Sequence, residues 1–115
     1  SLPSQILGAA WYPNSTANGD YWNWSANLAQ GSYTLTIFGL KFADHGKTEV
    51  YLDGVLVEGS LKDWYAAAIA YNEQQILEIE FAESGFHGIQ VKVNGKNASS
   101  SGYWLRLSCL ILRYR

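Results

Sequence analysis

The chain contains one cysteine, no methionine, two prolines and two histidines among its 115 residues. Because Cys109 is the only cysteine, an internal disulfide and a metal site built from several thiolates are both excluded. Its neighbours are Leu107, Leu110 and Ile111, so we expect the thiol to pack as a small apolar group.

Charge is also scarce. Charged residues make up 16% of the chain, and the formal net charge is −2. This composition gives no cationic surface for nucleic acid, and we expect no nucleic-acid partner. No apolar run is long enough to cross a bilayer and no basic-then-apolar leader is present, so we expect no membrane insertion. A chain of this length predicts a single domain over residues 1–115, with 1–4 a trimmed end or a linker. The absence of methionine predicts that the domain is excised from a longer chain.

Catalytic signatures are missing as well. The sequence has no GxSxG, no HExxH and no glycine-rich phosphate loop. His45 and His87 lie far apart in glycine-flanked loops, and we interpret both as ordinary loop residues. We therefore predict a domain that is not an enzyme and needs no cofactor.

The loops leave one metal alternative open. Asp20 with the loop 14–18, or Asp44, could contribute oxygen ligands to an irregular calcium site. Asn and Asp in turns more often bond to the backbone, so we predict no metal.

What the chain has in abundance is aromatic side chains, at 15%, in short alternating runs bounded by turn residues. Asp53-Gly54 between two apolar runs is a strong hairpin signal, because a type I′ turn needs positive φ at both central positions. The stretch 64–71 has alanines that would suit a helix, but its aromatics favour a strand. The pattern predicts an all-β fold, an antiparallel β-sandwich that is jelly-roll-like, with about eight strands. The predicted strands are 5–12, 21–27, 32–40, 48–52, 55–57, 64–71, 75–82, 89–93 and 103–115.

The last predicted strand is apolar on both faces. A surface strand of a monomeric sandwich should be polar outside, so a second apolar face indicates cover by another part of the protein or by a neighbouring subunit. We assign Leu105, Leu107, Cys109 and Ile111 to one face, and Trp104, Leu110, Leu112 and Tyr114 to the other, as an oligomer interface.

Exposed aromatics are the best indication of a ligand. A sugar ring can stack its C–H edges on an aromatic face while loop amides bond to its hydroxyls. Neighbouring strand residues point to opposite faces, so one member of each pair Trp11-Tyr12 and Trp64-Tyr65 should point outward. The alternative is that such rings fill the core. The candidate ligand-binding residues are Trp11, Tyr12, Asn14, Trp64 and Tyr65.

Three segments carry a family resemblance: GDYWNWSANLAQGSYTLTIFG, GKTEVYLDGVLV and GFHGIQVKVNGKNASSSGYWLRLSCLILR. They resemble β-sandwich domains of bacteriophage tail fibres and receptor-binding proteins. This resemblance implies a virion domain, commonly a homotrimer, that attaches to the host and recognises a cell-surface glycan. A purely structural capsid or fibre domain is an alternative.

The chain is also similar to β-sandwich carbohydrate-binding modules, which share the GxYtl and vylDG patterns. That similarity implies a secreted module of a larger enzyme. Such modules usually have an N-terminal acidic segment for calcium, which this chain lacks.

Overall fold

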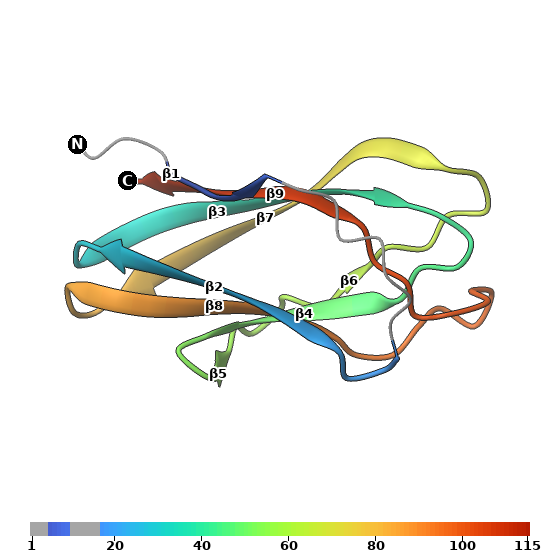
Figure 1. The fold of residues 1–115 in the computed structure, drawn as a ribbon, viewed down its shortest axis with the longest axis horizontal. Coiled ribbons are helices and arrows are strands. Elements are labelled where there is room, and N and C mark those ends of the chain that lie inside the picture. Colours follow the sequence, from blue (N-terminus) through green and yellow to red (C-terminus); the bar gives the residue numbers. More distant parts are fainter. Residues whose placement is uncertain (1–4, 10–16) are drawn as a thin grey trace.

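The computed structural model describes residues 5–9 and 17–115, which form two antiparallel sheets packed face to face (Figure 1). This confirms the predicted all-β sandwich, with nine strands in the described part. The four-stranded sheet has the order β1 (Gln5–Ala9), β9 (Leu107–Tyr114), β3 (Gly31–Lys41) and β7 (Ala70–Phe81). The five-stranded sheet has the order β2 (Tyr21–Leu28), β8 (Gly85–Val93), β4 (Lys47–Leu52) and β5 (Val55–Leu56), with β6 (Lys62–Asp63) paired to β4. Within these residues, no helix is long and apolar enough to cross a membrane.

The core lies between the sheets and follows the period of two. In β3, Leu35 and Ile37 have no exposed surface, while Thr36 between them is only partly buried. In β8, Ile89 and Val91 face them from the opposite sheet within the same apolar cluster. Alternation in the sequence therefore identifies the inner face of each sheet.

The predicted Asp-Gly hairpin is present between β4 and β5. Asp53 has φ 49° and Gly54 has φ 82°, the pair of positive values that a type I′ turn requires. The backbone N of Asp53 also donates to the carbonyl of Gly88 at 2.9 Å, which anchors the hairpin on β8.

The stretch 64–71 is not the strand that its aromatics favoured. Its backbone bonds to the loop between β3 and β4: Trp64 N donates to the Gly46 carbonyl and Phe42 N donates to the Trp64 carbonyl, both at 3.2 Å. One isolated bridge joins Phe42 to Tyr65, and β7 begins only at residue 70. Packing of Trp64 into the core has overridden local strand preference.

The last strand also differs from the prediction. Phe38 pairs with Cys109 but its neighbour Gly39 pairs with Leu107, so Ser108 is an extra residue that forms a bulge. The bulge shifts the alternation by one residue. Leu110 and Leu112, which are 0% and 1% exposed, consequently point into the core.

The predicted oligomer interface is therefore wrong for Leu110 and Leu112, and it stays a prediction for Trp104 and Tyr114. Tyr114 is half-buried and packs edge-on against Tyr33, with ring centroids 5.1 Å apart. Trp104 precedes β9 and lies among the loops at one end of the sandwich. Cys109 falls on the outer side of the strand and is half-buried, less than we expected.

Candidate functional site

Connections from distant parts of the chain meet at one end of the sandwich, at the right of Figure 1. We call residues 42–46, 62–66 and 94–106 the loop end. Gly46 N donates to the Trp104 carbonyl and Trp104 N donates to the Asp44 carbonyl, both at 2.9 Å. Ser101 N bonds to the carbonyl of Ala43 at 3.0 Å. These cross-loop bonds satisfy the backbone and fix the loops relative to one another.

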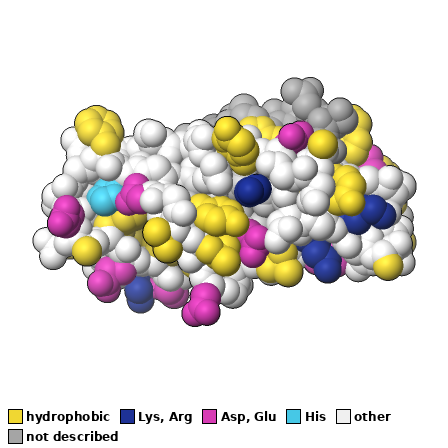
Figure 2. All heavy atoms as spheres, turned by 90° about the horizontal axis from the view of Figure 1, so that it is seen from below, with side chains coloured by type: hydrophobic (Ala, Val, Ile, Leu, Met, Phe, Trp, Pro, Cys, Tyr) yellow, Lys and Arg dark blue, Asp and Glu magenta, His cyan; other side chains and the backbone are white. Residues whose placement is uncertain are grey.

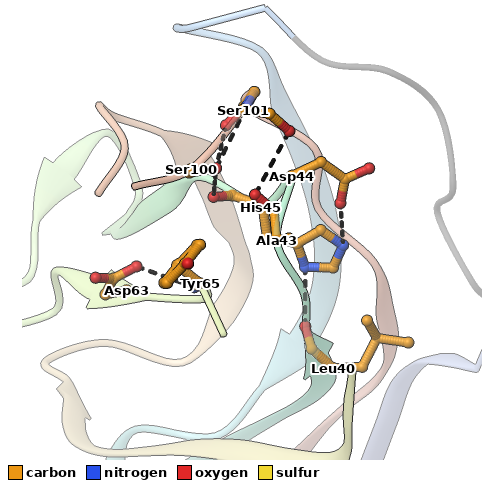
Figure 3. A network of polar contacts seen from close by, with 9 residues as sticks. Leu40, Ala43, Asp44, His45, Asp63, Tyr65, Ser100 and Ser101 are labelled. Atoms are coloured by element: carbon orange, nitrogen blue, oxygen red, sulfur yellow. Dashed lines mark hydrogen bonds and ion pairs between the residues drawn. The ribbon is translucent and has the colours of Figure 1, made fainter. Parts of the chain in front are cut away.

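Two polar side chains complete this network (Figure 3). The hydroxyl of Ser100, which is 4% exposed, donates to the His45 carbonyl at 2.7 Å. The carboxylate of Asp63 accepts from Tyr65 N at 3.0 Å and from Asn97 Nδ2 at 2.8 Å. Asp63 thus ties the 62–66 segment to the 94–106 segment.

The loop end carries four half-buried aromatic rings, those of Phe42, Tyr65, Tyr103 and Trp104. Lys96 Nζ lies 6.0 Å from the centroid of Tyr103, and the guanidinium of Arg106 lies 5.7 Å from that of Trp104. These are cation–π distances, which help to fix the orientation of the rings. Such a surface combines partly exposed aromatic side chains with polar hydrogen-bonding groups in one set of loops.

The predicted ligand-binding residues have different outcomes. Tyr65 lies at the loop end and is half-buried. Trp64 is 0% exposed, and its Nε1 donates to Thr48 Oγ1 at 2.8 Å, so its ring has no face for a ligand and the expectation for it is wrong. Trp64 instead anchors the connection that carries Tyr65. The predicted Trp11, Tyr12 and Asn14 lie outside the described residues.

Sequence reasoning missed Tyr103, Lys96 and Asn97. Tyr103 was assigned to the last strand, and the other two to a polar connecting loop. The run of Gly, Asn and Ser at 94–102 beside two aromatics was the available signal, because binding residues concentrate on loops held by a rigid scaffold.

His45 is a structural residue and not an exposed loop histidine. It has no exposed surface, and its Nδ1 lies 3.0 Å from the Leu40 carbonyl, which can only accept. Burial lowers the pKa of His45 despite the Asp44 carboxylate, whose Oδ1 is 3.7 Å from Nε2. The imidazole is therefore neutral near neutral pH.

No group of three or more His, Cys, Asp or Glu side chains converges on a metal site within residues 5–9 and 17–115. Asp20, one of the candidate calcium ligands, accepts from Ala17 N at 2.9 Å in a turn. Asp44, the other candidate, faces His45.

A histidine–carboxylate pair lies at the opposite end of the sandwich. His87 Nδ1 is 2.6 Å from Asp53 Oδ2, and His87 Nε2 is 2.7 Å from the Glu83 carbonyl. Both partners are acceptors, so both ring nitrogens carry hydrogen, and the bond to Asp53 raises the pKa of His87. In its protonated form this ring has no free nitrogen to accept a proton.

This pair makes stability depend on pH. The pKa of His87 is raised, so its contribution is complete below its ordinary value of about 6.5 and is lost as pH rises through the raised value. The same bond lowers the pKa of Asp53. The contribution of Asp53 to stability is lost only as pH falls through that lowered value. We expect the melting temperature to fall slightly as pH rises above about 6.5, a small effect because Asp53 is 47% exposed. His87→Gln should flatten this slope, and parallel curves for the two proteins would contradict the assignment.

No family model and no curated protein matches this sequence. Several solved structures share its fold. A xanthan lyase from Paenibacillus matches with 22% identity and TM-score 0.74, over 96% of this chain and 12% of that chain. A family 35 carbohydrate-binding module from Clostridium thermocellum matches with 15% identity and TM-score 0.69, over 99% of this chain and 100% of that chain. Carbohydrate-binding module CBM36, solved with calcium and xylotriose, matches with 17% identity and TM-score 0.53, over 95% of this chain and 92% of that chain.

These likenesses establish the β-sandwich fold. This chain spans about an eighth of the xanthan lyase, but nearly the full length of the two modules. None of the three is a virion protein, so the tail-fibre resemblance gains no support from them.

Proposed function

We propose that this domain is a non-catalytic carbohydrate-binding module of a larger extracellular enzyme, and that it holds a glycan at the loop end. The observation that carries the proposal is that the half-buried rings of Tyr65, Tyr103 and Trp104 lie in the same loop end as the hydrogen-bonded pair Asp63 and Asn97. The full-length structural likeness to modules described as carbohydrate-binding, one of them with xylotriose bound, supports it.

The recognition mechanism follows from the geometry. A tyrosine ring stacks on the C–H face of a sugar, while the remaining lone pairs of Asp63 and the side-chain carbonyl of Asn97 accept from its hydroxyls. Lys96, whose Nζ also bonds to the Ser100 carbonyl at 2.8 Å, can donate to a ring or hydroxyl oxygen. Because the loops are already cross-bonded, binding should cost little ordering entropy.

The virion reading shares glycan recognition but differs in assembly. Its expected homotrimer depended on the last strand, and three of the four interface residues lie in or against the core. The module reading needs no such interface.

The test is binding to a polysaccharide array that includes xylan, β-1,3-galactan and xanthan, followed by calorimetry on the best ligand. Tyr103→Ala and Tyr65→Ala should each weaken binding about two- to tenfold, since an aromatic contact contributes about 0.5–1.5 kcal/mol. Tyr103→Phe keeps the ring and should bind nearly as the parent does. The control is Thr34→Ala, which changes a residue of β3 outside the loop end. Full affinity in both folded alanine variants, or binding to nothing on the array, would refute the loop-end site.

A further inference from the structure

The outer face of the five-stranded sheet has an unusual composition. Figure 2 views the molecule from this side, where apolar side chains form separate patches among polar ones. Tyr21 is 56% exposed and Phe86 is 80% exposed, so neither contributes much to the core. We call the following residues the sheet face: Tyr21, Asn23, Glu49, Tyr51, Phe86, Gln90 and Lys92.

Strand register aligns these side chains in rows. Tyr21 pairs with Lys92, which pairs with Glu49 on the other side. Two residues further along, Asn23 pairs with Gln90, which pairs with Tyr51. From the spacing of strands and residues, the two tyrosines lie diagonally about 12 Å apart.

The polar groups between the rings are prearranged. Gln90 Nε2 donates to Asn23 Oδ1 at 3.1 Å, which leaves the other polar atom of each amide for a ligand hydroxyl. Lys92 Nζ lies 6.0 Å from the centroid of Tyr51. The charge of Lys92 is balanced by Glu49 in the same row. This face therefore complements a neutral, hydroxyl-rich chain better than a polyanion.

The path along β8 is open. Gly88 has no side chain, and a Cβ placed there would meet its nearest atom, Asp53 Oδ1, only at 3.9 Å. Lys92, Gln90, Gly88 and Phe86 alternate onto this face, and six residues of strand span about 20 Å. That length accommodates several consecutive sugar rings.

We infer that the sheet face is a second carbohydrate-binding site, which takes one extended, neutral polysaccharide chain lying along β8. It is separate from the loop end and uses different residues. Two sites on one domain would add avidity for a polymer.

The test is an NMR titration of the ¹⁵N-labelled domain with xylohexaose and cellohexaose, run on the parent and on a variant without the loop-end rings, Tyr65→Ala/Tyr103→Ala. The backbone amides of Asn23, Tyr51 and Gln90 should shift in both proteins. Tyr51→Ala and Gln90→Ala should each weaken this response at least fivefold with a dispersed spectrum retained. Thr34→Ala should leave it unchanged.

The outcomes separate the two sites. If the sheet-face amides stay unmoved at millimolar ligand, the inference is overturned, whatever the loop end does. If the sheet-face amides shift while the loop-end amides do not, the proposed loop-end site is refuted and the sheet-face site is supported. Tighter binding of oligogalacturonate than of both neutral hexasaccharides would overturn the neutral ligand class.

Discussion

Trp64→Ala is expected to lower the free energy of unfolding by about 3–5 kcal/mol, the usual cost of removing a large buried aromatic ring. The indole has no exposed surface, and it supplies the donor for Thr48 Oγ1, a buried acceptor. The variant loses both the packing and the hydrogen bond. Urea denaturation followed by circular dichroism measures the effect.

Two matched variants isolate the cause. Trp64→Phe retains most of the apolar contact and loses the Nε1 donor, so its cost should lie clearly below that of Trp64→Ala. Tyr65→Ala, at the half-buried neighbour, should destabilise the domain least of the three. A Trp64→Ala protein of normal stability but reduced glycan affinity would contradict the burial of this ring and make Trp64 the outward member of the pair Trp64-Tyr65.

Leu110→Ala should cost about 2–5 kcal/mol of stability and leave the solution mass unchanged. Leu110 is 0% exposed and belongs to the central apolar cluster between the sheets. Denaturation and analytical ultracentrifugation on the same sample separate a core role from an interface role.

The control is its neighbour Ile111, which points outward and is half-buried. Ile111→Ala should cost less than half as much. If Leu110→Ala were instead fully stable and dissociated an oligomer, the assignment of this residue to the core would be refuted.

The fold was predictable from the sequence because its signals are local. Period-two alternation in β3 and β8 identifies which side chains are buried, and Asp53-Gly54 specifies its turn without reference to any partner strand. These features are written within a few consecutive residues.

The two errors have a different origin. The bulge at Ser108 is defined by the pairing with Phe38 and Gly39 on the facing strand. The sequence of the last strand alone therefore does not predict it. The conformation of the segment after β6 depends on the packing of Trp64 into the core beside Thr48. That packing is a property of the assembled core. Both concern long-range pairing, which alternation alone cannot provide.

The candidate site was only partly predictable for the same reason. Tyr65 was found through its aromatic neighbourhood, but Tyr103, the other tyrosine of the loop end, lies 38 residues further along the sequence. The bond from Asn97 to Asp63 spans 34 residues. Loops from three connections converge only after the sheets have formed.

A crystal structure of the domain with its best-binding oligosaccharide tests the account most directly. We predict a sugar ring stacked on Tyr65 or Tyr103, with hydroxyls bonded to Asp63 or Asn97 and the loops where they lie without ligand. An empty loop end beside oligosaccharide ordered elsewhere on the domain would contradict it.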